Sequence, residues 1–238
     1  MDRRPRQRES GRVSVKVSGG ARSLRIDGTF ASWYRPGVAI TGSVWDALAA
    51  PLLLLPGPRR TRVLILGLGG GSAARVARAL APRAQITGVE IDADVVRAAR
   101  RWFDLDGLGV EVVRMDARRY LERTRKRFDV ILEDIFVGKG RSVRKPQWLP
   151  VPGLALAASR LRKGGVLASN TIEEAAAVTG VMRGLFPSLL HIDVEDYDNR
   201  IVVGAAFPLS GVTLRSTVKR SSVLRSTAGQ LKIRAVRA

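Results

Sequence analysis

A glycine-rich turn follows an apolar run in the stretch RVLILGLGGGSAARVA, which spans residues 62–77. Four glycines make up most of this turn: Gly67, Gly69, Gly70 and Gly71. They permit a tight turn and allow the backbone to approach a ligand closely. Ser72 stands where the N-cap of a following helix is expected. A buried strand, a glycine turn and a helix N-terminus together form a cradle for a nucleotide.

Three acids stand at the ends of the next predicted strands. Glu90 ends a strand in ITGVEID, where a carboxylate can accept hydrogen bonds from both hydroxyls of a ribose. Asp116 ends the following strand and can accept a hydrogen bond from an adenine amino group, cap the helix that begins at Ala117, or do both. Asp134 ends FDVILED and is expected to leave a buried strand and point into a cleft. Because ligands of α/β sheets bind at the carboxyl ends of strands, we favour a functional role for Asp134.

For other polar residues the sequence gives weaker evidence of a functional role. Trp45 and Asp46 lie on a helix ahead of the sheet and are tentative substrate residues, although Trp45 also suits a core position. Glu133 should point away from Asp134 by strand alternation and receives no role. A cluster of acids after the sixth predicted strand either lines the cleft or forms a solvated turn: Glu195, Asp196 and Asp198.

The elements that position these residues alternate between strand and helix. Strands are predicted at 62–67, 85–91, 110–115, 128–134, 165–170, 189–195 and 200–207, and helices at 72–81, 93–103, 117–126, 153–162 and 173–185. This alternation requires crossover connections and a mainly parallel sheet covered on both faces. The last two strands are too close for a helix between them and should pair antiparallel. A seven-stranded, Rossmann-like α/β sheet with an antiparallel last strand matches the class I S-adenosylmethionine-dependent transferases.

Further segments are predicted before and after the α/β sheet. Residues 1–10 are expected to be a flexible basic arm, and residues 11–58 to hold a small N-terminal β unit and an entry helix. Residues 59–208 form the predicted nucleoside-binding α/β domain. Residues 209–238 contain no acid and scattered apolar residues, so we expect a loosely attached basic tail.

Composition narrows the possible functions. The 238 residues are 45% hydrophobic, which suffices for a core, and no apolar run reaches the ~18 residues of a membrane span. The chain has no cysteine and one histidine, so no metal site is expected, and the cytoplasm is the default compartment. The net charge is +20, about two thirds of it in residues 1–25 and 209–238. This charge indicates either solvated tails or a weak contact with nucleic acid or an anionic surface.

Residues 62–172 resemble the catalytic domain of spermidine synthases, the polyamine aminopropyltransferases. Four motifs occur in the order and at the spacing of that family: ILGLGGG, GVEID, MDARRYL and FDVILED. The β unit and the segment TGSVWDALA at 41–49 resemble the family's N-terminal β domain and the entry to its active site. The resemblance extends over roughly residues 11–207.

The resemblance implies decarboxylated S-adenosylmethionine, or S-adenosylmethionine, as co-substrate. It implies that the nucleoside is held by Gly67, Gly69, Gly71, Glu90, Ile91, Asp116 and Ala117. Asp134 stands at the position of the family's catalytic aspartate and would deprotonate an amine acceptor that attacks a carbon beside the sulfonium. Relatives of this kind are commonly homo-oligomers.

One departure from the family and one electrostatic objection keep alternatives open. The family's glycine motif has the form GGGDGG, whereas the chain has GLGGGS, which lacks the aspartate that helps to hold the aminopropyl amine. The loop after Asp134 carries four cations that oppose a polyamine at the cleft mouth: Lys139, Arg141, Arg144 and Lys145. A methyltransferase acting on a neutral or anionic acceptor, and a non-catalytic protein that binds nucleoside or nucleic acid, are therefore the alternatives.

Overall fold

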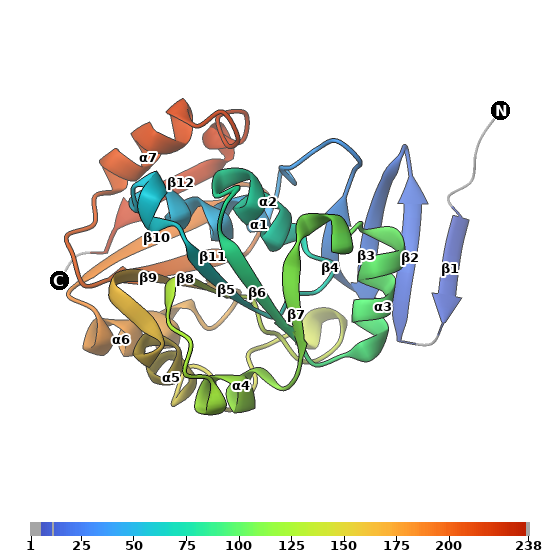
Figure 1. Ribbon diagram of the computed structural model, residues 1–238, viewed down its shortest axis with the longest axis horizontal. Helices are drawn as coiled ribbons and strands as arrows, with labels where there is room; N and C mark the ends of the chain where they lie inside the picture. Colours follow the sequence, from blue (N-terminus) through green and yellow to red (C-terminus); the bar gives the residue numbers. More distant parts are fainter. Residues whose placement is uncertain (1–5, 11, 237–238) are drawn as a thin grey trace.

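The structure is a computed structural model that describes residues 6–10 as backbone and residues 12–236, the side chain of Arg141 excepted. Its centre is an eight-stranded sheet in the order β12-β10-β11-β9-β8-β5-β6-β7 (Figure 1). The strands are β5 (Arg62–Leu66), β6 (Gln85–Glu90), β7 (Val110–Arg114), β8 (Phe128–Glu133), β9 (Leu161–Thr171), β10 (Ser188–Val194), β11 (Arg200–Ala205) and β12 (Leu231–Ala235). Strands β5 to β9 pair in parallel, and β10, β11 and β12 join them in antiparallel pairs. The predicted α/β class is confirmed, with one strand more than expected.

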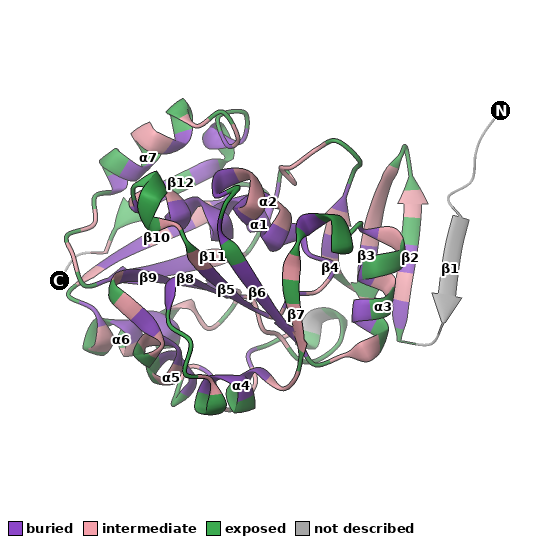
Figure 2. Ribbon diagram, viewed as in Figure 1, coloured by how far each residue is buried: buried purple, intermediate pink, exposed green. Residues whose placement is uncertain are grey.

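Helices cover both faces of this sheet (Figure 1). They are α1 (Val44–Ala49), α2 (Ser72–Leu80), α3 (Ala93–Trp102), α4 (Ala117–Arg123), α5 (Gly153–Ser159), α6 (Ala175–Leu185) and α7 (Gly211–Arg220). One apolar core joins α1, α2 and α7 to the sheet, and a second joins α4, α5 and α6 to its other face. Strand β8 is buried along its whole length and β5 is buried after its first residue (Figure 2), which explains why their sequences are nearly continuous apolar runs.

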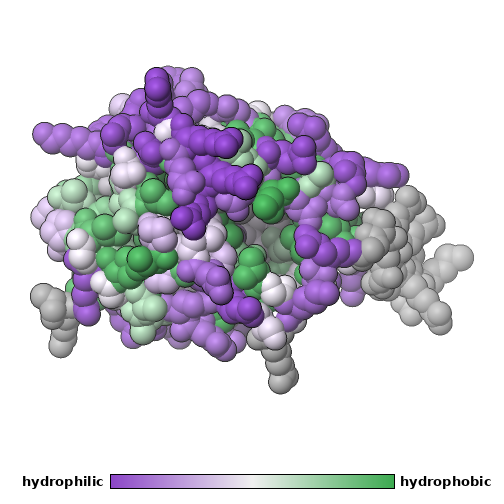
Figure 3. Space-filling view, turned by 90° about the horizontal axis from the view of Figure 1, so that it is seen from below, coloured by the Kyte–Doolittle hydropathy of each residue, from purple (hydrophilic) through white to green (hydrophobic). Residues whose placement is uncertain are grey.

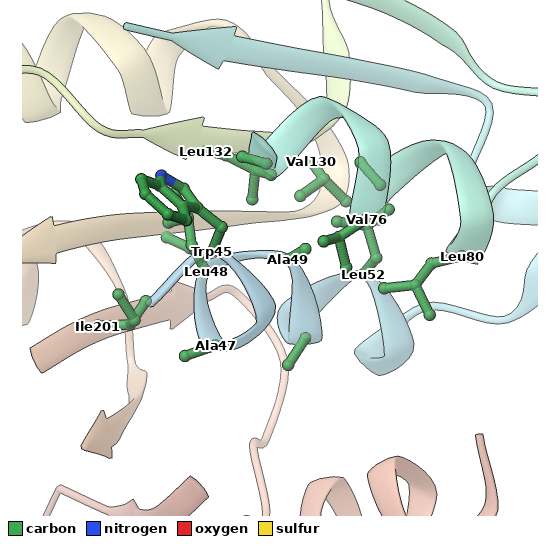
Figure 4. Close-up of a cluster of buried hydrophobic side chains, with 14 of the residues drawn as sticks. Trp45, Ala47, Leu48, Ala49, Leu52, Val76, Leu80, Val130, Leu132 and Ile201 are labelled. Carbon is green, nitrogen blue, oxygen red and sulfur yellow. The ribbon is translucent and has the colours of Figure 1, made fainter. Parts of the chain in front are cut away.

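The first core contains the helix that carries Trp45. Leu48 and Leu52, from α1 and the 3-10 turn that follows it, pack beside Val76 of α2 and beside strand β8 (Figure 4). Trp45 lies in the same cluster, close to Leu132 near the carboxyl end of β8 (Figure 4). The entry helix therefore packs on the α/β sheet, and this packing places one face of α1 beside the predicted site.

A second, antiparallel sheet precedes the α/β domain. Its strands are β1 (Arg6–Ser10), β2 (Val13–Ser18), β3 (Ala21–Ile26) and β4 (Thr29–Tyr34). The predicted flexible arm at 1–10 is wrong for residues 6–10, because they pair with β2 as strand β1, while residues 1–5 lie outside the described residues. The sheet packs against α3 through a small core that includes Leu24, Tyr34 and Phe103.

The segment after Pro208 is also folded. Leu214 and Val218 of α7 and Leu231 and Ile233 of β12 are buried, and β12 pairs with β10 at the edge of the main sheet. The expectation of a loosely attached tail is therefore wrong over residues 211–235. Polar residues alternate with apolar ones in β12, as an edge strand with one solvated face requires.

Two predicted boundaries also shift. Helix α5 ends at Ser159, and β9 begins at Leu161 because this buried leucine already pairs with Phe128. Gly164, with a φ of 72°, allows β9 to bulge before the regular register resumes at Val166.

No helix among the described residues is long and apolar enough to cross a membrane. The face drawn in Figure 3 is largely hydrophilic, with hydrophobic side chains gathered towards the end where α5 and α6 lie.

Candidate active site

The glycine turn and the Asp134 segment are in direct backbone contact. The Asp134 amide donates to the carbonyl of Leu66 at 2.8 Å. Gly67 has a φ of 82°, and a Cβ added there would lie 2.5 Å from the Asp134 carbonyl oxygen. A glycine is therefore required at this position both for its left-handed conformation and for the closeness of the two segments.

Glu90 links the end of β6 to the glycine turn. Its Oε2 accepts a hydrogen bond from the Gly69 amide at 3.0 Å, and its Oε1 accepts one from the Asp92 amide at 3.0 Å. Burial raises the pKa of Glu90, and these amide donors act against that shift. Each oxygen keeps a further lone pair, so the carboxylate can still accept hydrogen bonds from a ligand.

The other predicted nucleoside residues lie along the same edge. Asp116 caps α4 by accepting from the Arg119 amide at 2.9 Å, so the capping alternative is confirmed and contact with adenine stays a prediction. Ala117 is the first residue of that helix, and the side chain of Ile91 is 63% exposed just beyond β6. Sheet order places Asp116, Glu90, the glycine turn and Asp134 at the ends of adjacent strands.

One prediction about the glycine turn is wrong. The N-cap of α2 is Gly71, with a φ of 87°, and Ser72 is the first helical residue. The Ser72 hydroxyl instead accepts from the amide of Trp33 and donates to its carbonyl, both at 2.8 Å. Ser32 of the same strand, β4, accepts from the Gly70 amide at 2.6 Å. The N-terminal sheet is thus bonded directly to the glycine turn.

Two side chains hold the carboxylate of Asp134. The indole Nε1 of Trp45 donates to Oδ2 at 3.0 Å, and the amide Nδ2 of Asn170 donates to Oδ1 at 2.7 Å. Burial raises the pKa of Asp134 to about 6, although Asn170, Lys145 and Trp45 all favour the charged form. A carboxylate with this pKa is suited to accept a proton near neutral pH.

Asn170 has no role in the sequence-based prediction. It lies near the carboxyl end of β9 and is 2% exposed. Its Oδ1 accepts a hydrogen bond from Asn199 Nδ2 at 2.9 Å, which fixes its donor amide towards Asp134. The sequence could have identified Asn170, because it is a polar residue at the end of the strand predicted at 165–170. The same rule selected Glu90, Asp116 and Asp134.

A buried ion pair involves Glu133, the residue directly before Asp134. Lys145 Nζ is 2.7 Å from Glu133 Oε1, and the two side chains are 2% and 1% exposed. The same ammonium donates to the Ile135 carbonyl at 3.1 Å, and the Ile135 amide donates to Glu133 at 2.7 Å. The expectation that Lys145 opposes a cation at the cleft mouth is wrong, because Glu133 neutralises it inside the protein.

The rest of that loop reaches the N-terminal sheet. Val137 and Arg144 pair through two backbone hydrogen bonds of 2.8 and 2.9 Å, which close the loop into a narrow hairpin. At its tip the Gly140 amide donates to the Thr29 hydroxyl at 3.0 Å. Lys139 lies 3.8 Å from Asp27, so a carboxylate partly offsets this second cation as well.

The side chain of Asp46 is not accessible to a substrate. It is fully buried, and its carboxylate accepts hydrogen bonds from the amides of Thr41 and Gly42 at 2.8 and 2.9 Å. Its tentative place with the substrate is therefore contradicted, whereas its helix neighbour Trp45 does contact Asp134. The difference follows from the helix, because consecutive residues point in directions about 100° apart.

Exposed acids gather beside the Asp134 site. The loop between β10 and β11 ends at Asn199, which bonds Asn170 and through it Asp134. Four side chains in this loop and in the loop after β9 are exposed carboxylates: Glu173, Glu195, Asp196 and Asp198. Among the residues with described side chains, no carboxylate of this group forms an ion pair.

The chain is similar in sequence to proteins that are named as transferases. A methyltransferase domain family model matches residues 63–141. A probable polyamine aminopropyl transferase of Bifidobacterium longum is 32% identical over 133 residues, which are 55% of this chain and 28% of the relative. This chain spans about half or less of the length of the curated relatives it matches first.

Solved structures show the same fold. A probable spermidine synthase from Corynebacterium glutamicum superposes with a TM-score of 0.75 at 20% identity, over 96% of this chain and 89% of that one. A spermidine synthase in complex with the transition-state analogue AdoDATO superposes with a TM-score of 0.63 at 16% identity, over 85% and 72% of the two chains. The protein is thus similar in sequence to polyamine aminopropyltransferases and has the class I methyltransferase-like fold of spermidine synthases.

Proposed function

We propose that the protein is a transferase that binds an adenosine-bearing sulfonium and transfers an aminopropyl group to an amine, with Asp134 as the base. The observation that carries this proposal is the placement of the Asp134 carboxylate. It lies at the carboxyl end of β8, between the donors of Trp45 and Asn170, on a segment in backbone contact with the glycine turn.

The nucleoside would lie along the strand ends from the glycine turn to α4. Glu90 would accept hydrogen bonds from the ribose through the lone pairs that Gly69 and Asp92 leave free. Ile91 would cover one face of the adenine, with Asp116 and Ala117 at its edge. The AdoDATO complex of a spermidine synthase with this fold supports a ligand of this class.

The reaction would be an in-line displacement. The amine nitrogen donates its lone pair to the methylene carbon beside the sulfonium, a C–N bond forms, and the C–S bond breaks to release methylthioadenosine. The proton lost from the amine passes to Asp134, whose pKa of about 6 leaves it mostly ionised at pH 7. Alignment of the nitrogen with the sulfonium supplies most of the acceleration.

The electrostatics of the site favour a cationic acceptor. The ammonium of Lys145 is neutralised by Glu133 at 2.7 Å and lies inside the protein, so it does not oppose a positively charged amine in the cleft. Exposed carboxylates occupy the loops next to Asn170, and each would attract an ammonium group at contact distance by roughly 1 kcal/mol in water. These charges weaken the objection that the sequence raised against an amine, because Lys145 and Lys139 have carboxylate partners, whereas the exposed Arg144 forms no ion pair with the described residues.

Methyl transfer from S-adenosylmethionine is the second candidate, and Gly70 favours it. Gly70 is the fourth residue of GLGGGS, and the spermidine synthases, which the chain resembles, have the aspartate of GGGDGG at this position. A Cβ added at Gly70 would lie 2.8 Å from Ser32 Cβ, so β4 occupies the space that such a side chain would need. A site without that carboxylate lacks one group expected to select the aminopropyl amine.

Calorimetry separates these two candidates. The intact protein would be titrated with decarboxylated S-adenosylmethionine, S-adenosylmethionine and methylthioadenosine. Aminopropyl transfer predicts that the decarboxylated sulfonium binds more tightly than the carboxylated one. Tighter binding of S-adenosylmethionine would replace aminopropyl transfer with methyl transfer, and failure of all three to bind would remove the nucleoside site itself.

A further inference from the structure

Cations gather where the parallel strands begin. The amino ends of β6, β5, β8 and β9 lie side by side in the sheet, at the opposite end of the strands from Asp134. Four segments lead into these strands, at 59–62, 83–85, 123–127 and 160–163. Together they contain 11 Lys or Arg residues and no acid. We call these four segments the basic edge.

The four segments form one continuous surface. Arg59 Nη2 donates to the Lys163 carbonyl at 2.6 Å, and Arg127 Nη1 donates to the Ser159 carbonyl at 2.7 Å. The Gln85 amide donates to the Thr61 carbonyl at 2.8 Å, which joins the start of β6 to the start of β5. Each segment of the basic edge is therefore bonded to the chain beside it.

Most of this positive charge is not neutralised. Among the described residues, two ion pairs connect the basic edge to carboxylates, Lys126 to Glu111 at 2.7 Å and Arg162 to Asp129 at 3.3 Å. Other guanidinium groups, such as that of Arg59, donate to backbone carbonyls, which hold them in place without cancelling their charge. A guanidinium held in this way loses less entropy when it binds an anion.

We propose that the basic edge binds the phosphate backbone of duplex nucleic acid. Four adjacent strands span about 14 Å at ~4.8 Å between neighbours, and about eight phosphate charges of a duplex lie along that length. Seven of the eleven cations are exposed, and six of these seven form no ion pair with the described residues, so the exposed charges are opposite in sign to this row and comparable to it in number. The surface is separate from the proposed catalytic site and does not depend on the proposed reaction.

The composition of the edge selects this partner over others. The exposed large hydrophobic side chains of the described residues all lie elsewhere in the chain: Phe30, Ile91, Val137, Val151, Tyr197 and Val212. Without an exposed aromatic ring the edge has no platform for unpaired bases, and without exposed apolar side chains it has nothing to insert into a membrane. Contact through phosphates alone predicts binding that is independent of sequence and steeply dependent on salt.

Fluorescence anisotropy with a labelled 20-base-pair DNA tests the proposal. The test variant carries Arg83→Gln, Arg123→Gln, Arg125→Gln and Lys163→Gln. These four side chains are exposed and form no ion pair with the described residues, so the fold should be retained. The wild-type protein should lose affinity steeply as KCl rises. The variant should bind at least about tenfold more weakly and show a salt slope reduced by up to about 4.

A matched variant removes the same charge from another surface. It carries Lys219→Gln, Arg220→Gln, Arg225→Gln and Lys232→Gln, on and after α7, where all four side chains are exposed. The proposal predicts that its affinity stays within about twofold of the wild type. Equal losses in both variants would show attraction by net charge alone and overturn the proposal.

Two further probes decide the class of partner. A single-stranded DNA of the same length should bind more weakly than the duplex, and vesicles containing phosphatidylserine should bind no better to the wild type than to the test variant. Preference for the single strand, or vesicle binding that depends on the four substituted residues, would contradict the assignment. Absence of salt-dependent duplex binding by the wild type would also contradict it. Circular dichroism and thermal melting check that each variant is folded.

Discussion

The indole of Trp45 and the carboxylate of Asp134 are 89 positions apart in the chain and joined by a hydrogen bond of 3.0 Å. This bond connects α1 to the carboxyl end of β8, and the rings of Trp45 and of Phe30 in β4 form a T-shaped contact with 5.2 Å between their centroids. The candidate base is thus supported by the α/β domain and, through Phe30, by the N-terminal sheet.

Replacement of Trp45 by phenylalanine removes the donor and keeps an aromatic ring. Because a hydrogen bond to a charged acceptor stabilises it by about 1.5–3 kcal/mol, we expect kcat/KM to fall at least about tenfold at pH 7. The pKa of Asp134 should rise, which moves the acid limb of the pH profile to higher pH. Phe30→Leu is the matched control, since it alters the ring contact and leaves the indole N–H in place. An unchanged pH profile in Trp45→Phe would show that this bond does not act on Asp134.

The pH dependence of kcat/KM reports on Asp134 directly. Burial raises the pKa of this carboxyl to about 6, above the ~3.9 of an exposed aspartate. A general base acts in its ionised form, so kcat/KM should rise with pH through an apparent pKa near 6 and level off from about one pH unit above it. An acid limb centred near pH 4 would mean that the group that controls activity is not the buried Asp134.

The ion pair of Lys145 and Glu133 predicts a coupled effect on stability. Lys145→Met leaves the carboxylate of Glu133 buried without its partner, which should cost about 3–5 kcal/mol in the free energy of unfolding. The double variant Lys145→Met with Glu133→Gln removes both charges and should recover most of this loss. Urea unfolding of the two single variants and the double variant measures the coupling. Additive losses would show that the two side chains do not stabilise each other.

The contact of Gly70 with Ser32 predicts a steric effect. Gly70→Ala places a Cβ 2.8 Å from Ser32 Cβ and 3.1 Å from the Phe103 ring, so we expect a loss of about 1–3 kcal/mol in stability. In a Ser32→Gly background part of this loss should disappear, because the closest atom is gone. A thermal-melting cycle of the four proteins tests this, and an equal cost of Gly70→Ala in both backgrounds would rule out the clash with Ser32.

The sequence predicts the parts of the site that depend on strand ends. Glu90, Asp116 and Asp134 follow apolar strands, and parallel strands must end at a common edge, so their placement in neighbouring positions follows from the alternation of elements. Whether these acids bind the nucleoside and act on the acceptor stays a prediction. The capping role of Asp116 was foreseeable because its position before a helix is a local feature.

Other features depend on contacts between distant segments. The pairing of Lys145 with Glu133 requires the hairpin closed by Val137 and Arg144, and strand alternation alone gives no partner for Glu133. Strand β12 has one apolar face and lies at a sheet edge, so its short alternating sequence resembles a solvated tail. Ser72 has the side chain of an N-cap, but Gly71 adopts the left-handed conformation and takes that position.

The central claim is that the Asp134 carboxylate is the base of the transfer. The direct test is the release of methylthioadenosine from decarboxylated S-adenosylmethionine and a diamine, with wild type and Asp134→Asn compared under identical conditions. We expect turnover by the variant to fall at least about 100-fold, with its calorimetric affinity for methylthioadenosine within a few fold of wild type. Turnover by Asp134→Asn close to that of the wild type would contradict the account.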